Sequence, residues 1–158
     1  MDEVWGLLAE RGVPVVVHAS SIPLPGRCTG PAPIGGLLEY HPTLPLVVAH
    51  LGMPEYDEFF ELAETFPNVR LDTTMTFTDF AERGMPFPAR LRPRLRDLGL
   101  AGKVLLGSDF PNIPPYAHQL HALDRLDLGD DWLRAVCWDN ADNLFDLSSH
   151  YTRSAGHL

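Results

Sequence analysis

Three side chains that can bind a metal ion or move a proton each close a short apolar run. His18 ends the run VVVH, His50 ends LVVAH and Asp109 ends VLLGSD. Imidazole nitrogen and carboxylate oxygen are ligands that zinc, iron and manganese accept, and both groups also serve as general acids and bases. These residue types in these positions therefore indicate metal-assisted or acid–base chemistry.

The repetition of this pattern favours a shared site over three unrelated residues. A single histidine at the end of a strand is more often a packed, hydrogen-bonded residue than a ligand. Asp109, however, follows a buried Gly-Ser step, where a carboxylate is costly to desolvate unless a cation or hydrogen-bond donors hold it. We interpret His18, His50 and Asp109 together as the lining of one site.

Four apolar runs alternate with amphipathic segments along the chain. The strands are predicted at residues 13–20, 44–52, 68–74 and 103–111, and the helices at 2–11, 54–66, 88–99, 115–126 and 130–146. The run at 13–20 lacks polar alternation, which predicts a strand buried on both faces. Residues 21–36 are rich in Pro and Gly and are predicted to form a loop, followed by a helical turn at 37–41. Residues 75–87 are ambiguous, with a short helix as one interpretation.

This alternation predicts a parallel α/β sheet built from βαβ units. The crossovers point all the strands the same way, so their carboxyl ends share one edge, where α/β proteins place their chemistry. A flavodoxin-like sheet is the alternative fold. It would need a phosphate-binding first loop, and residues 19–36 have glycines without a convincing helix start to cradle a phosphate.

The composition of the chain narrows the classes of molecule that it could bind. The 158 residues carry a net charge of −9, with 21 acidic and 12 basic side chains, which argues against nucleic acid and anionic membranes as partners. No apolar run approaches the ~20 residues needed to span a bilayer. Cys28 and Cys137 are far apart and form no CxxC pair, which favours the reducing cytoplasm over a disulfide scaffold.

Five segments carry a resemblance to a known family. PVVVHAS, PLVVAHLG, FPNVRLDTT, KVLLGSDFP and a helix containing DNADNLF resemble, in order and spacing, the amidohydrolase superfamily, in the branch similar to aminocarboxymuconate-semialdehyde decarboxylase. The resemblance runs from about residue 3 to 147. It implies that the strands are numbers five to eight of a TIM barrel, so that residues 1–147 form the C-terminal half of the barrel and residues 148–158 a polar tail.

The resemblance also implies a role for each residue of the site. His18 matches a histidine that binds the metal. His50 matches one that contacts the metal-bound water or the substrate as acid/base in single-metal members and is a ligand in two-metal members. Asp109 matches an aspartate that binds the metal and accepts the proton of the water. The implied activity is hydrolysis of a small carboxylated or cyclic metabolite with a divalent metal, zinc foremost; non-oxidative decarboxylation is the alternative.

One expected motif is missing from this sequence. Family members open with a strand that carries two metal-binding histidines as HxH, and nothing here matches it. A catalytic zinc usually has three protein ligands and a water, whereas this chain supplies His18 and Asp109, with His50 as a weak third. Three explanations are open. The chain is a fragment or has a misplaced start, or it is a half-barrel that pairs with another subunit or with a copy of itself as a homo-oligomer. The third is that it has lost metal binding. An inactive half-barrel that serves as an assembly or binding module is therefore a second functional hypothesis.

The remaining polar and aromatic residues have simpler interpretations. Thr73 and Thr74 could bond a substrate, although a turn role is favoured, and Ser108 lies in no GxSxG nucleophile turn. Trp132 and Trp138 are expected to pack against, or to cover, the C-terminal helix. The other five histidines are expected to be solvated or structural: His41, His118, His121, His150 and His157.

Overall fold

A four-stranded parallel sheet organises the computed structural model, which describes residues 2–112 and 116–147. Its strands lie in the order in which they occur in the sequence: β1 (Val15–Val17), β2 (Leu46–Val48), β3 (Val69–Asp72) and β4 (Val104–Leu105). All three pairs of neighbours are parallel, which confirms the predicted α/β sheet. The strands are shorter than predicted because the chain turns away at their carboxyl ends. The predicted polar tail, 148–158, lies outside the described residues.

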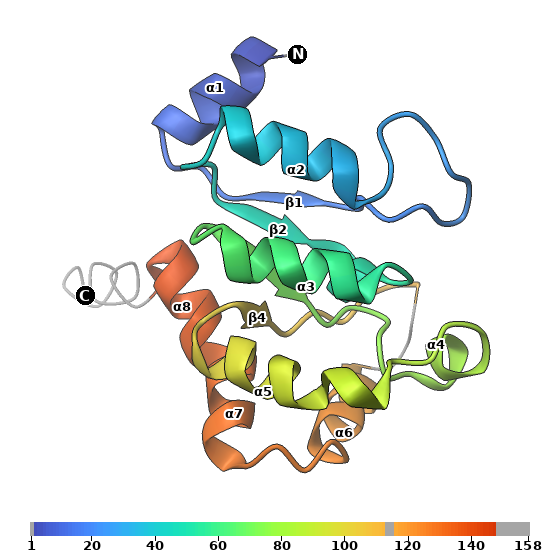
Figure 1. Ribbon diagram of the computed structural model, residues 1–158. Helices are drawn as coiled ribbons and strands as arrows, with labels where there is room; N and C mark the ends of the chain where they lie inside the picture. Colours follow the sequence, from blue (N-terminus) through green and yellow to red (C-terminus); the bar gives the residue numbers. More distant parts are fainter. Residues whose placement is uncertain (1, 113–115, 148–158) are drawn as a thin grey trace, which may run out of the picture.

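Helices precede, connect and follow the strands, and some of them cover one face of the sheet. They are α1 (Asp2–Glu10), α2 (Pro31–Tyr40), α3 (Tyr56–Thr65), α4 (Asp79–Gly84), α5 (Arg92–Leu100), α6 (Tyr116–Asp124), α7 (Asp130–Arg134) and α8 (Asn140–Phe145), with 3₁₀ turns at Ala49–Gly52 and Ala89–Leu91 and a π turn at Ala135–Asp139. Figure 1 shows α2, α3 and α5 side by side in front of the strands. No helix within residues 2–112 and 116–147 is long and apolar enough to cross a membrane.

Helix α2 corrects the prediction of a loop over residues 21–36. It begins at Pro31, directly after Gly30, whose φ is 87°. Proline suits the first turn of a helix because its fixed φ is already helical and its missing N–H would have no helical acceptor there. Ile34 and Leu38 then bury one face of the helix. The Pro and Gly content indicated a loop, but the burial of this apolar face decides the conformation.

The core lies between the sheet and this helical layer. Leu46, Val48, Val69, Leu71 and Val104 point into it and are fully buried. Trp132 is also fully buried, and its Nε1 donates to the carbonyl of Leu95 over 3.2 Å. The expectation that Trp132 packs is therefore confirmed. Trp138 lies in the π turn and is 54% exposed, so it is only partly packed.

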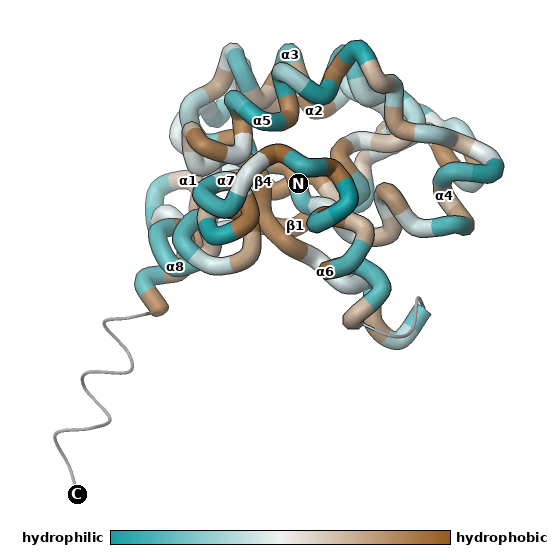
Figure 2. The backbone as a smooth tube through the Cα atoms, turned by 90° about the horizontal axis from the view of Figure 1, so that it is seen from below, coloured by the Kyte–Doolittle hydropathy of each residue, from teal (hydrophilic) through white to brown (hydrophobic). Residues whose placement is uncertain are grey.

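The opposite face of the sheet is only partly covered. Val16, Val47 and Arg70 are paired in register across β1, β2 and β3, and side chains in register share a face of a sheet. Val16 is 60% exposed, so the prediction that this strand is buried on both faces was wrong. The helical layer lies on the other side of the strands (Figure 2), and β1 is an edge strand with a neighbour on one side only.

Arg70 is a half-buried cation on this open face. Its Nε is buried without a hydrogen-bond partner among the described residues, and Nη1 reaches the carbonyl of Asn68 only at 3.5 Å. Burial lowers the pKa of Arg70, because an apolar environment disfavours the charged form. The neighbouring Lys103 donates to the carbonyls of Phe66 and Pro67 over 2.8 and 2.6 Å, so its charge is better satisfied.

We therefore expect Arg70→Met to stabilise the isolated chain. The methionine keeps the packing of the aliphatic stem and removes an unpartnered buried donor, which should raise the free energy of unfolding by about 1 kcal/mol. Urea denaturation followed by circular dichroism measures the change. Arg96→Met, on the exposed side of α5, is the matched control and should leave stability unchanged. A loss of stability in Arg70→Met would mean that the guanidinium has a stabilising partner.

Candidate functional site

A cavity of about 740 Å³ lies at the carboxyl end of the strands on the open face of the sheet. His18, His50 and Asp109 all line it. Val16 and Asp72 also line it, and they lie on the open face because successive side chains of a strand alternate between faces. The structure thus brings the three residues of the predicted site to one cavity.

His18 lies at the mouth of this cavity. Its Nε2 is 2.8 Å from the carbonyl oxygen of Ile22 and 3.3 Å from Oγ of Ser20. A carbonyl can only accept, so Nε2 carries the hydrogen and Nδ1 of the neutral ring keeps its lone pair. The rings of His18 and His50 meet edge to face, with their centroids 5.0 Å apart. The two histidines can therefore act on the same small group.

His50 is held from two sides. Its backbone N–H donates to Oδ1 of Asp72 over 3.1 Å, and its Nδ1 lies 2.7 Å from Oγ1 and 3.0 Å from the carbonyl oxygen of Thr74. Thr74 Oγ1 itself donates to Asp72, so the hydrogen between Thr74 and the ring belongs to Nδ1. The neutral ring then keeps the lone pair of Nε2 free to accept a proton. This arrangement suits a general base.

Backbone conformation also singles out this edge of the sheet. His50 and Asp109 adopt left-handed conformations, with φ of 60° and 56°. Residues other than glycine rarely do so, and they persist there when surrounding contacts hold them, commonly at functional sites. For His50 the holding contacts are the bonds to Asp72 and Thr74. Two of the three predicted site residues are thus held in costly conformations.

Sequence reasoning missed Asp72 and undervalued Thr74. Asp72 is buried, and its Oδ1 accepts from the backbone N–H of His50 and of Thr74, the latter over 2.9 Å. Thr74, for which a turn role was expected, contacts the ring of His50 instead. A usable signal was present, because Asp72 ends the third strand just as His18, His50 and Asp109 follow the others.

Asp109 lies half-buried on the loop after β4. Its carbonyl accepts from the backbone N–H of Asn112 over 2.7 Å, and Ser108 Oγ accepts from the N–H of Phe110 over 3.2 Å. The serine hydroxyl is therefore part of a local turn. A glycine is needed at position 107, just before this turn, because a Cβ there would collide with Cγ2 of Thr74. The loops after β3 and β4 can meet only because residue 107 has no side chain.

The donors of the cavity match a metal site in type but not in number. His18 supplies an imidazole and Asp109 a carboxylate to the same cavity, and these are ligands of divalent transition metals. Within residues 2–112 and 116–147, no three His, Cys, Asp or Glu side chains are arranged to hold a metal ion. The described residues therefore fit part of a metal site rather than a whole one.

The other histidines lie apart from this cavity. His41 contacts Asp2 at 3.0 Å, in keeping with a structural role. His118 and His121 are exposed on α6 and line a second cavity. His150 and His157 lie outside the described residues. His18 and His50 are thus the only described histidines that line the first cavity.

The fold is shared with known TIM barrels. An uncharacterized TIM-barrel protein from Bordetella bronchiseptica is 19% identical, with a TM-score of 0.72 over 93% of this chain and 50% of its own. A 2,6-dihydroxybenzoate decarboxylase from Rhizobium is 18% identical, with a TM-score of 0.60 over 93% and 55%. A zinc-bound amidohydrolase from Burkholderia multivorans is 18% identical, with a TM-score of 0.61 over 92% and 56%.

These comparisons show a partial barrel. The chain spans about half the length of the solved structures that it matches, as expected for strands five to eight of a (β/α)₈ barrel. No curated protein matches the sequence. The family model for amidohydrolases matches residues 1–147, which is nearly the whole chain. The chain therefore belongs to the amidohydrolase family.

Proposed function

We propose that this chain is the catalytic half of a metal-dependent hydrolase that acts on a small carboxylated or cyclic metabolite. The observation that carries the proposal is the convergence of His18, His50 and Asp109 on one cavity. His18 and Asp109 would hold a divalent metal, most suitably zinc, together with donors from the remainder of the barrel. Such an ion lowers the pKa of a bound water toward ~7 and polarises a carbonyl.

His50 and Asp109 supply the proton transfers in this proposal. The hydrogen on Nδ1 of His50 is engaged by Thr74, so Nε2 can take a proton from the attacking water and return it to the leaving group. Asp72 fixes the position of His50 through its backbone N–H. Asp109 would both bind the metal and accept a proton. Cys28 and Cys137 are unpaired, which supports a reducing compartment such as the cytoplasm.

Two alternatives remain in view. Non-oxidative decarboxylation uses a similar site, and a solved structure of the same fold is named as a 2,6-dihydroxybenzoate decarboxylase. The short donor set favours a second alternative, in which the chain is an inactive half-barrel that binds a partner or a second copy of itself. The inactive half-barrel differs from both enzymes in that His18 and Asp109 would contact no metal.

Zinc binding by the purified 158-residue chain tests the proposal. Isothermal titration, with histidine ring signals followed by NMR, should show one weak zinc site that shifts the signal of His18. His18→Ala and Asp109→Ala should each weaken zinc binding by about tenfold or more, because each removes one of few ligands. His41→Ala removes a histidine that lies with Asp2 outside the cavity and should bind zinc as the unaltered chain does.

The opposite results would overturn the proposal. If zinc leaves the His18 ring signal unchanged, or if His18→Ala and His41→Ala bind it equally, this chain contributes no metal ligand from the cavity. The inactive half-barrel would then be the better account. Sedimentation of the same sample would show whether the chain pairs with a copy of itself.

A further inference from the structure

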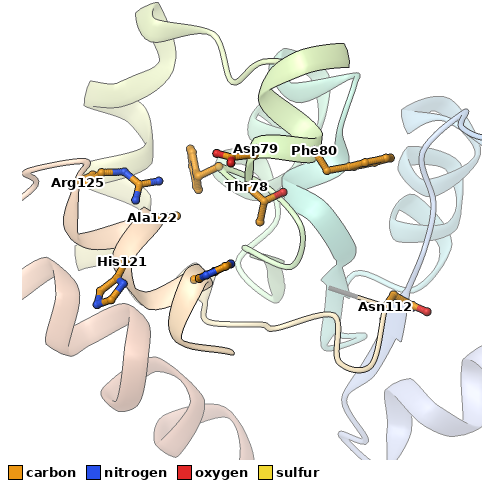
Figure 3. Close-up of a pocket in the computed structure, with 9 residues that line it drawn as sticks. Thr78, Asp79, Phe80, Asn112, His121, Ala122 and Arg125 are labelled. Carbon is orange, nitrogen blue, oxygen red and sulfur yellow. The ribbon is translucent and has the colours of Figure 1, made fainter. Parts of the chain in front are cut away.

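A second cavity, of about 530 Å³, adjoins the first. Phe80 and Asn112 line both cavities, so the two lie side by side. One wall of the second cavity comes from the segment after β3, with Thr78 and Asp79, and the other from α6 (Figure 3). A molecule of modest size could therefore extend from one cavity into the other.

Three nitrogen-bearing side chains, two from α6 and one from the residue that follows it, line this space. His118, His121 and Arg125 all line the cavity, and their spacing of three and four residues places them on one side of a helix. Among the described residues, none of these three side chains forms a hydrogen bond or an ion pair. Figure 3 shows Arg125, the residue after α6, extending toward the opposite wall. Their donors remain available to a ligand.

Among the described arginines, Arg90, Arg94 and Arg134 pair with carboxylates. Arg94 Nε and Nη2 donate to Glu64 over 2.8 Å each, and Arg90 pairs with Asp57. Asp79 lines the second cavity but forms no ion pair with Arg125 in the described residues. The structure thus leaves Arg125 unneutralised beside two imidazoles in a concave surface.

The two walls are fixed to each other beneath the open rim. Gln119 of α6 is 2% exposed, and its Nε2 donates to the carbonyls of Thr73 and Thr76 on the other wall, the latter over 3.1 Å. The floor is apolar, with Phe77 and Ala122 both buried. Donors held above an apolar floor are the usual make-up of a small-molecule site.

We propose that this second cavity binds a carboxylate of the substrate, with Arg125 as its main partner and His118 and His121 as further donors. The reacting group would then lie in the adjoining cavity, against His50 and Asp109. This inference rests on the proposed function for the identity of its ligand. A guanidinium favours an anion over a metal cation, and no three metal-binding side chains in the described part of the chain are arranged to hold an ion.

Benzoate, with benzamide as its neutral analogue, is a suitable probe. Titration of each into the ¹³C,¹⁵N-histidine-labelled chain should move the ring signals of His118 and His121 with benzoate and not with benzamide. Arg125→Gln should weaken benzoate binding by about tenfold or more, since it removes a charge-assisted hydrogen bond. Asp79→Asn should strengthen binding by removing a like charge. Arg134→Gln, at an exposed pair with Asp139, is the control and should have no effect.

The outcomes separate this inference from the metal proposal. Benzoate binding needs neither metal nor turnover, so a binding site that depends on Arg125 stands even if zinc fails to shift His18. Conversely, zinc may shift His18 while Arg125→Gln and Arg134→Gln bind benzoate equally, and that result would overturn the carboxylate site alone. Equal binding of benzamide would also overturn it, because the cavity would then recognise the ring and not the charge.

Discussion

Asp72→Ala is expected to lower the free energy of unfolding by about 3 kcal/mol and to release the ring of His50. The carboxylate is buried and accepts from two backbone N–H groups and from the Thr74 hydroxyl. Each buried donor left without a partner costs about 1–3 kcal/mol. Thr74 and His50 would then lose the group that holds them together. Urea denaturation measures the stability, and the chemical shifts of the His50 ring report its position.

Two further variants test whether the hydrogen-bond acceptor at residue 72 matters or only its negative charge. Asp72→Asn keeps an oxygen in place and should cost less than Asp72→Ala while preserving the environment of His50. Asp97→Ala removes an exposed carboxylate from α5 and should change stability by less than about 0.5 kcal/mol. If Asp72→Ala were as mild as Asp97→Ala, the hydrogen bonds to Asp72 would not be what holds His50 in its left-handed conformation.

Trp132→Ala should destabilise the chain by about 3–5 kcal/mol, the largest effect that we expect from any single truncation. The indole is fully buried between α5 and α7, and its Nε1 bonds the carbonyl of Leu95. Gly99 packs so closely against it that an added Cβ would overlap the ring. The surrounding helices cannot collapse into the space, because Asn140 ties the carbonyls of Gly99 and Val104 together.

Trp138→Ala is the matched control. Trp138 is 54% exposed, so its truncation should alter the midpoint of thermal or urea unfolding only slightly. The pair of variants changes composition identically and differs only in burial. Equal effects of the two would show that Trp132 does not support α5 and α7 in solution as it does in this structure.

Much of the fold could be predicted from local patterns. The apolar runs before His18, His50 and Asp109 predicted strands, and the alternation with helices predicted a parallel sheet, because a crossover forces neighbouring strands to point the same way. The first and last residues of the helices and strands were less predictable. Residues 31–36 contain Pro and Gly and were assigned to a loop, yet they begin α2, since burial of Ile34 and Leu38 outweighs weak helix propensity.

The candidate site, too, could be predicted only in part from the sequence. The order of elements in the sequence determined that His18, His50 and Asp109 follow the first, second and fourth strands of a parallel sheet and therefore lie at one edge of it. Only the tertiary structure decided that Asp72 and Thr74 orient His50 and that Val16 lies on an uncovered face. It also brought His118 of α6, and Arg125 directly after that helix, beside the segment after β3. The physical reason is that strand order follows from chain connectivity, whereas hydrogen-bond partners and cavities depend on how separate elements pack in space.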